Sequence, residues 1–266
     1  AGLCKRDLSY IQLRTFGLGE SMVNETLTPL LEAHPGLNVS YCVHHGIVDV
    51  RLSSGKVALS RQELESIANE CREELGENFI CYGQDSLAKV IFDQLRSMEK
   101  TLAVAESCTG GLLSNAFTDL PGASKVFMGG VVCYRNDIKV QMLDVPEPVL
   151  HQHGAVSAET AVAMVMGCAE RFDSDYALGI TGFAGPGGGT PENPVGTVYM
   201  GYYSPAGVWS RKLVYPGERL AVKARAVNAA LDFMRRKLLK HKVDEFIKDM
   251  EEAPSSPGSG SGGSPQ

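Results

Sequence analysis

The segment TLAVAESCTGG, at residues 101–111, constrains the fold more than any other stretch of this chain. Residues 101–105 have the length and apolar character of a buried strand, and two glycines then lead into a helical pattern over 112–120. Ser107 is therefore predicted at a strand-to-helix corner. The first N–H groups of a helix lack partners within it and favour negative charge. This corner suits a hydroxyl nucleophile beside an anion site; the alternative is that Ser107 or Thr109 simply caps the helix.

Apolar spacing divides the rest of the chain into two domains and a tail. Residues 1–84 have the order strand, helix, strand, strand, helix, strand, which is typical of a small two-layer βαββαβ domain. Residues 85–243 alternate helices with strands, which predicts a larger three-layer α/β domain with a mixed sheet. Residues 244–266 end in a run of Pro, Ser and Gly, and we expect a disordered tail or linker there.

The predicted elements follow from the same spacing. In the first domain they are strand 8–15, helix 19–33, strands 37–43 and 48–53, helix 61–75 and strand 78–82. In the second they are helix 85–99, strand 101–105, helix 112–120, strand 127–134, helix 137–143, a long helix from residue 157, strands 176–180, 196–203 and 208–215, and a closing helix over 218–240.

Composition limits the classes of function. The 266 residues carry a formal charge of −6, which argues against a protein that binds nucleic acid by neutralising phosphates. The seven cysteines are scattered and never spaced as C-x-x-C, so neither a disulfide framework nor a metal site is expected. No apolar run approaches the roughly 20 residues that span a bilayer. We expect a cytoplasmic protein with reduced thiols and no membrane partner.

The loop TGFAGPGGGT, at residues 181–190, is a second candidate site. It follows a predicted buried strand, and ligands of open α/β sheets bind at the carboxyl ends of strands. Closely spaced glycines also let backbone N–H groups approach an anion. The loop matches neither G-x-G-x-x-G nor G-x-x-x-x-G-K-[ST], so we expect no dinucleotide cofactor and no P-loop. The alternative is a purely structural loop.

Three polar side chains are further candidates. Tyr134, at a predicted strand end, and Lys139, a turn later, could converge on Ser107, although a spacing of five does not place them on one helix face. Arg219 begins the last helix and has the planar fork that recognises phosphate. For both Lys139 and Arg219 the alternative is a solvated surface side chain.

Six blocks of this sequence together resemble the signature series of the CinA C-terminal domain, the nicotinamide-nucleotide amidohydrolase or NMN deamidase family. The blocks are AESCTGG at 105–111, Y-x-N-x-x-K at 134–139, GAVS at 154–157, TGFAGPGGG at 181–189, PVGTV at 194–198 and PGER at 216–219. Residues 8–84, with TFGLGES at 15–21, similarly resemble the KH-like middle domain of full-length CinA proteins. We expect the chain to lack the usual first domain of those proteins, which is linked to ADP-ribose pyrophosphatase activity.

The resemblance implies hydrolysis of the carboxamide of nicotinamide mononucleotide (NMN) to nicotinate mononucleotide and ammonia, without cofactor or metal. It implies Ser107 as the nucleophile and Lys139 and Tyr134 as proton-transfer groups. The expected substrate-binding set is Glu106, Cys108, Thr109, Gly110, Gly111, Asn136, Thr181, Gly182, Gly185, Gly187, Gly188 and Arg219. Arg135 stands where the family commonly has Ser, and Phe183 replaces the commoner Ile, so both bear on substrate affinity.

Two other readings of the resemblance stay open at this point. The first is a non-enzymatic interaction module linked to competence or DNA damage, which the acidic charge disfavours for direct binding of nucleic acid. The second is ADP-ribose pyrophosphatase activity, which would depend on the domain that we expect to be missing. The expected partner is a small-molecule substrate, and we expect a homo-oligomer with no nucleic-acid partner.

Overall fold

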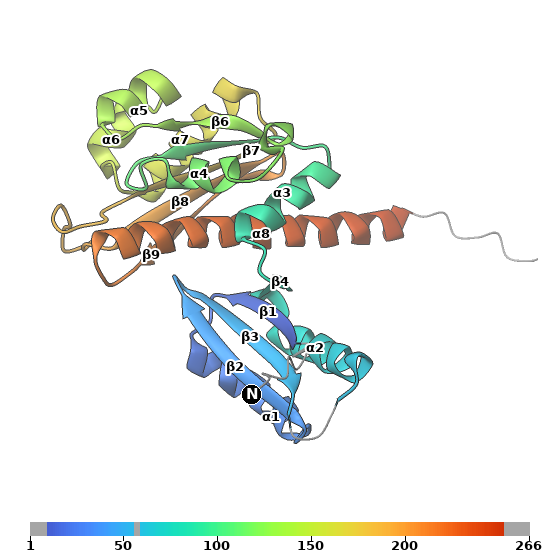
Figure 1. Ribbon diagram of the computed structural model, residues 1–266. Helices are drawn as coiled ribbons and strands as arrows, with labels where there is room; N and C mark the ends of the chain where they lie inside the picture. The colour runs from blue at the N-terminus through green and yellow to red at the C-terminus, as the bar shows by residue number, and fades with distance from the viewer. Residues whose placement is uncertain (1–9, 56–58, 253–266) are drawn as a thin grey trace, which may run out of the picture.

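Two α/β domains lie on either side of the long C-terminal helix α8 (Arg219–Glu252), as Figure 1 shows. The computed structural model describes residues 10–55 and 59–252, with side chains as far as residue 240. Residues 8 and 9 of the first predicted strand, and residues 253–266 of the predicted tail, lie outside the described residues.

The small domain is a four-stranded antiparallel sheet with two helices packed on it. Its elements are β1 (Tyr10–Phe16), α1 (Glu20–Glu32), β2 (Leu37–His44), β3 (Ile47–Ser54), α2 (Arg61–Leu75) and β4 (Phe79–Tyr82), with a 3-10 turn at Gly76–Asn78. The strand order is β2-β3-β1-β4. Leu27 of α1 and Leu64 of α2 share one core with Leu13 and Val50 of the sheet. The predicted βαββαβ order is therefore confirmed.

The large domain is a five-stranded mixed sheet with helices on both faces. Its elements are α3 (Leu87–Ser97), β5 (Leu102–Glu106), α4 (Leu112–Thr118), a 3-10 turn (Ala123–Lys125), β6 (Phe127–Val132), α5 (Asn136–Leu143), α6 (Glu147–His153), α7 (Ala158–Phe172), β7 (Tyr176–Gly182), β8 (Thr197–Ser204) and β9 (Gly207–Val214). The strand order is β6-β5-β7-β8-β9, parallel from β6 to β7 and antiparallel beyond.

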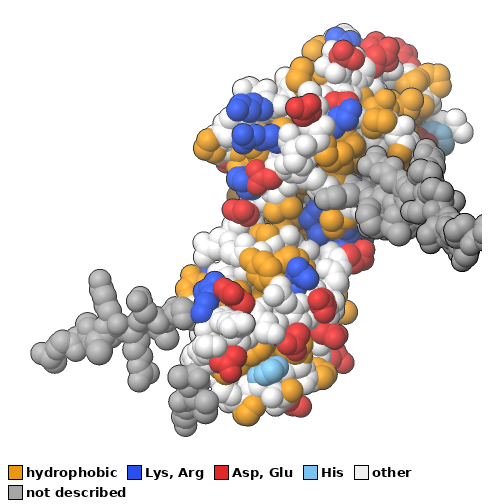
Figure 2. Space-filling view, turned by 90° about the vertical axis from the view of Figure 1, so that its right-hand side faces the viewer, with side chains coloured by type: hydrophobic (Ala, Val, Ile, Leu, Met, Phe, Trp, Pro, Cys, Tyr) orange, Lys and Arg blue, Asp and Glu red, His pale blue; other side chains and the backbone are white. Residues whose placement is uncertain are grey.

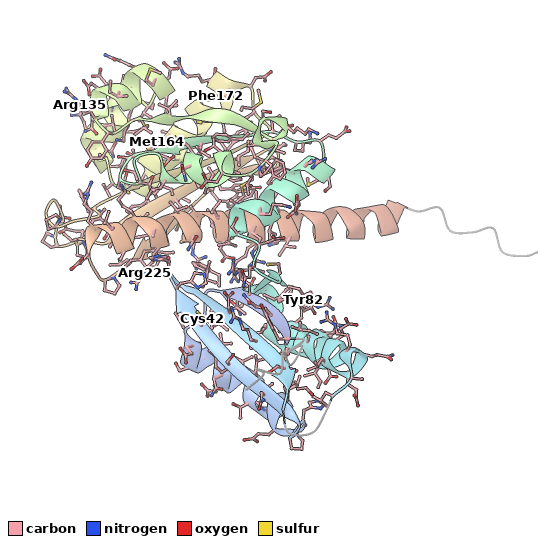
Figure 3. All side chains as sticks on the ribbon, viewed as in Figure 1. Cys42, Tyr82, Arg135, Met164, Phe172 and Arg225 are labelled. Atoms are coloured by element: carbon pink, nitrogen blue, oxygen red, sulfur yellow. The ribbon has the colours of Figure 1, made fainter. Side chains whose placement is uncertain are left out.

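Two apolar cores lie on opposite faces of this sheet, which confirms the three-layer prediction. Helices α3, α4 and α8 form one core with Val104, Leu178 and Met200. Helix α7 forms the other, in which Met164, labelled in Figure 3, packs near Ala103. Strand β5 lies inside the sheet, between β6 and β7, and is covered on both faces, which explains why all of its residues are buried.

The structure differs from the predicted elements in three places. Strand β6 ends at Val132, so Tyr134 lies beyond it in the connection to α5. Helix α6 was missed; it begins after Pro146 and carries Pro148 in its first turn, where a missing N–H is tolerated. The predicted tail boundary at residue 244 falls inside α8, which continues to Glu252.

Two glycines allow helix α7 to pack backbone to backbone. A Cβ atom on Gly201 of β8 would overlap the carbonyl oxygen of Ala161, and one on Gly167 would overlap that of Leu143. Helix α7 therefore sits directly on the sheet and on the last residue of α5. This contact fixes α5, whose buried side chains are Lys139 and Leu143.

Charged side chains of α8 join the two domains. Asp232 and Arg235 are each 2% exposed and form an ion pair, and Arg235 also donates to the carbonyl oxygens of Glu77 and Phe79. Arg236 bonds Asp232 as well, and donates to Phe16 O and Asn78 Oδ1 in the small domain. One buried carboxylate thus orders two arginines that contact the small domain.

The surface carries charges of both signs. Figure 2 shows one face, on which blue Lys and Arg side chains alternate with red Asp and Glu side chains in both domains. Among the described helices, none combines the length and the apolar character needed to cross a bilayer.

Candidate active site

Ser107 lies at the predicted corner, directly after the buried strand β5. Its N–H donates to Ile180 O of β7 at 2.9 Å, and its carbonyl accepts from Gly110 N at 3.2 Å. Gly110 and Gly111 have φ values of +63° and +100°, a left-handed conformation that favours glycine. The chain therefore turns sharply between strand and helix, and Ser107 stays 8% exposed.

Glu106, expected among the substrate-binding residues, does not line the pocket and is bonded to the start of α4. Its fully buried carboxylate accepts from Gly111 N and Leu113 N at 3.0 Å, and from Ser114 N and Oγ at 2.8 and 2.7 Å. The carboxylate thus occupies the start of α4, which we had expected to be open to a ligand anion. The capping alternative for Ser107 or Thr109 is replaced by capping from Glu106.

Two N–H groups of the corner stay available. Among the described residues, none accepts a hydrogen bond from the N–H of Cys108 or of Thr109. These two groups directly follow Ser107, which is where an oxyanion formed on its acyl group would need donors. The expected anion site is therefore smaller than the run from Cys108 to Gly111.

Lys139 brings a buried amine to the nucleophile. Its Nζ lies 3.3 Å from Ser107 Oγ, 2.9 Å from Cys133 O and 3.3 Å from Tyr134 O, and the side chain is fully buried. Burial lowers the pKa of Lys139 below the ordinary lysine value, and no described carboxylate faces it to oppose this effect. A neutral amine has two N–H groups, which suit the two carbonyls, and one lone pair, which suits the serine hydroxyl.

The neighbouring thiols of Cys108 and Cys133 do not stabilise the protonated form of Lys139. Burial raises the pKa of Cys108 to about 11 and also raises the pKa of Cys133. Both thiols are therefore uncharged near neutral pH, and only as thiolates would they favour the protonated form of Lys139.

Tyr134 and Arg219 meet at the mouth of the pocket. Arg219 Nη2 donates to Tyr134 Oη at 3.2 Å, and Nη1 donates to Gly185 O at 2.7 Å. Lys139 contacts the main-chain oxygen of Tyr134, whereas its phenol is on an exposed side chain bonded to Arg219. The geometry therefore supports Tyr134 as part of the rim and gives no support for the proton transfer expected of its phenol.

A pocket of about 210 Å³ opens over Ser107. The expected residues that line it are Ser107, Cys108, Tyr134, Lys139, Thr181, Gly182, Gly185, Gly187 and Arg219. Ala155, Val156, Phe183 and Ala184 line it as well and were not predicted as site residues, although GAVS and the glycine loop contain them. Thr181 Oγ1 donates to Ala155 O at 2.6 Å and so holds two walls together.

The other expected binding residues do not line this pocket. Thr109 is buried with no described partner for its hydroxyl, and Asn136 lines a separate hollow between α5 and α6. Gly110 and Gly111 shape the corner, and a Cβ on Gly188 would lie 3.3 Å from the Phe183 ring. The three glycines therefore contribute to the backbone conformation of the two loops.

The two departures from the family pattern differ in position. Arg135 pairs with Asp137 at 2.9 Å with 77% of its side chain exposed, and Figure 3 shows it at the outer edge of the large domain. Phe183 lines the pocket itself. Of the two, only Phe183 is placed to affect the substrate directly.

Lys223 is a cation beside the corner loop that the sequence analysis did not single out, and it is not among the residues that line the pocket. It follows Arg219 by one helical turn on α8, a spacing that could have identified it. Its Nζ lies 3.6 Å from the position that a Cβ on Gly110 would take, so the ammonium is beside the corner loop.

The described residues contain no group of three or more His, Cys, Asp or Glu side chains arranged to hold a metal ion. The six cysteines among them are free thiols.

Two family models match the chain. The CinA C-terminal domain matches residues 84–238, and the damage-inducible protein CinA KH domain matches residues 12–83. A CinA-like protein from Kosmotoga olearia is 40% identical over 229 residues, which cover 85% of this chain and 56% of that protein. A putative competence-damage inducible protein from Caldanaerobacter subterraneus is 41% identical, with 87% and 56% covered. The chain spans about half the length of these relatives.

Solved structures resemble a little over half of the chain. The competence/damage inducible protein CihA from Agrobacterium tumefaciens is 37% identical with a TM-score of 0.55, and the match covers 56% of this chain and 92% of that one. A CinA superfamily protein from Klebsiella pneumoniae is 30% identical with a TM-score of 0.56, over 58% of this chain and 96% of that one.

Proposed function

The chain belongs to the CinA family, and from the chemistry around Ser107 we propose that it hydrolyses the carboxamide of NMN to nicotinate mononucleotide and ammonia. One observation carries the proposal: the fully buried Lys139 amine, with no described carboxylate to pair with, lies against the Ser107 hydroxyl. Burying an unpaired amine is costly, and such perturbed groups gather at functional sites.

In the first half of the reaction, Ser107 Oγ attacks the amide carbon and transfers its proton to Lys139 Nζ. A serine hydroxyl is a weak nucleophile at neutral pH and needs such a base. The amide oxygen becomes negatively charged, and the N–H groups of Cys108 and Thr109 are available to stabilise it. When the carbon–nitrogen bond breaks, Lys139 returns the proton to the leaving nitrogen, which departs as ammonia.

The second half uses the same groups in reverse order. A water molecule attacks the Ser107 ester, Lys139 takes its proton, and the oxyanion again faces Cys108 and Thr109. Collapse of this intermediate releases the carboxylic acid and returns the proton to Ser107 Oγ. Lysine serves as acid and base in turn because its lowered pKa makes both forms accessible.

The pocket walls suit a flat, positively charged ring. Phe183 supplies an aromatic face, and the side chains of Val156 and Ala184 are apolar. An aromatic face attracts a cation placed over it, and a pyridinium is such a cation. The carboxamide would then point to Ser107, and the ribose phosphate would point toward the mouth that Arg219 and Tyr134 form.

The test is ammonia release from NMN by the wild-type chain and by Ser107→Ala. We expect turnover by the wild type, with kcat/KM rising with pH until Lys139 is deprotonated, and a loss of at least about a thousandfold in Ser107→Ala, since the covalent route is removed. Ser114→Ala, which removes a hydroxyl bonded to Glu106 instead, is the matched control for general damage. Unchanged turnover in a folded Ser107→Ala protein would refute the nucleophile and the proposal with it.

A further inference from the structure

The pocket is too small to enclose a whole mononucleotide. Its volume of about 210 Å³ is below the roughly 300–1,000 Å³ that is typical of small-molecule sites. Under the proposed function, on which this inference rests, the pyridine ring would fill the pocket and the 5′-phosphate would extend past the rim. The side chains of that rim then decide whether a phosphate is recognised.

The obvious cation of the rim is already engaged. Both terminal nitrogens of Arg219 donate to groups of the protein, namely Gly185 O and Tyr134 Oη. These contacts tie the glycine loop to the connection before α5. Arg219 therefore acts as a positioning residue that holds two walls of the pocket, although its remaining N–H groups can still contact an anion.

Most N–H groups at the start of α4 are engaged as well, and the proposed reaction assigns those of Cys108 and Thr109 to the oxyanion. The N–H groups of Gly111, Leu113 and Ser114 bond the Glu106 carboxylate, so these three have no capacity left for a second anion. A fixed negative charge at this point would also repel a phosphate. A side chain beside this capped helix start is therefore the candidate that we consider for the phosphate.

We propose that Lys223 binds the 5′-phosphate of the substrate and so selects mononucleotides over ribosides. Its ammonium lies beside Gly110, one turn along α8 from Arg219, and is half-buried. No described side chain forms an ion pair or a hydrogen bond with it, whereas Arg225, Arg235 and Arg236 of the same helix are all bonded to the protein. A lysine without a described partner beside the corner loop is suited to a phosphate as a point charge.

The charge of Lys223 reaches the pocket wall. Burial raises the pKa of the Cys108 thiol to about 11, and the charges of Arg219 and Lys223 act against this rise. Cys108 is adjacent to Ser107 and lines the pocket. Both cations are therefore close enough to act on an anion bound at this edge.

The experiment compares NMN with nicotinamide riboside in Lys223→Ala, Lys223→Arg and Lys240→Ala. Lys240 is exposed on the same helix, so its substitution removes the same charge away from the site. We expect Lys223→Ala to lose roughly ten- to hundredfold more kcat/KM on NMN than on the riboside, as for a lost charge-assisted contact. Lys223→Arg should recover most of this loss, and Lys240→Ala should match the wild type on both substrates.

A binding arm separates this inference from the proposed reaction. In the Ser107→Ala background, calorimetry with NMN and with the riboside measures affinity without chemistry. If no variant hydrolyses any amide but Lys223→Ala still weakens NMN binding alone, the proposed reaction fails and the phosphate site stands. If NMN is hydrolysed and Lys223→Ala lowers kcat/KM equally on NMN and on the riboside, the phosphate site is refuted and the reaction stands.

Discussion

At the scale of the residue, the site depends on one amine held away from water. Lys139 is fully buried with two carbonyl oxygens and one hydroxyl around Nζ, and burial lowers its pKa. A neutral polar side chain could contact Ser107 with a far smaller free-energy cost of burial than an amine. Under the proposed function, the lowered pKa of Lys139 suits it to act as the base for Ser107.

Lys139→Met should change how stability depends on pH. Because the pKa of Lys139 is lower in the folded chain than in the unfolded one, the unfolded state binds the extra proton between the two values. The unfolding free energy of the wild type therefore increases as pH rises through that window. The Met variant has no amine to titrate at this position, so this increase is absent. We expect the stability of Lys139→Met relative to wild type to fall as pH rises from 7 toward about 10, where free lysine titrates.

Urea unfolding of both proteins at several pH values measures this difference. Lys240→Met, on the exposed part of α8, removes a lysine at the surface and is the control. A difference that stays constant from pH 7 to 10 would mean that the folded chain does not depress the pKa of Lys139.

At the scale of the element, the corner between β5 and α4 is built around Glu106. Helix α4 has no capping side chain at its own N-cap, Gly111, and the strand residue Glu106 supplies the carboxylate instead. The helix start is thus tied to the strand that carries Ser107. This contact leaves Cys108 and Thr109 as the only corner N–H groups free of a described acceptor.

Glu106→Gln should destabilise the chain and slow the reaction together. The amide replaces one acceptor oxygen by a donor that faces N–H groups, and it removes the charge from hydrogen bonds worth roughly 1.5–3 kcal/mol each. We expect a loss of about 2–4 kcal/mol in urea unfolding and a clear fall in kcat on NMN. Glu170→Gln, on the exposed side of α7, removes the same charge and should do neither; a stable, active Glu106→Gln would show that the cap is dispensable.

At the scale of the whole molecule, α8 belongs to both domains. Its first turns carry Arg219 and Lys223 to the pocket, and its middle carries Asp232, Arg235 and Arg236 to the small domain. The buried Asp232 accepts from both arginines, which in turn satisfy carbonyls of residues 77–79 and 16. This carboxylate therefore orders the charged part of the contact between the domains, beside the apolar core that Phe16, Ile47 and Ile80 share with α8.

Asp232→Ala should loosen the small domain. Removing one partner of a buried ion pair leaves an uncompensated charge and costs about 3–5 kcal/mol. We expect faster amide hydrogen exchange at β1 and β4, where the arginines attach, with the corner at Ser107 less affected. Asp93→Ala, which breaks the exposed Lys89–Asp93 pair, should cost at most about 0.5 kcal/mol; equal effects of the two substitutions would contradict this account of the interface.

The amino-acid sequence by itself determined the alternation of strands and helices and the corner at Ser107. Short-range spacing was enough for these: α2 begins and ends where its apolar period predicts, and β5 is the apolar run before ESCTGG. Helix α6 was missed because its prolines usually end a pattern, and the end of α8 was misplaced because charged residues continue the helix past its apolar stripe.

Only the tertiary structure decided what the polar side chains do. Lys139 and Ser107 are 32 residues apart, and Tyr134 and Arg219 are 85 apart, so their contacts depend on how α5, β5 and α8 pack. Burial, and with it the lowered pKa of Lys139, comes from neighbours on other elements. Glu106 had the character of a ligand residue in sequence, but the fold turned it toward α4, because unpaired N–H groups at a buried helix start must be satisfied by the nearest acceptor.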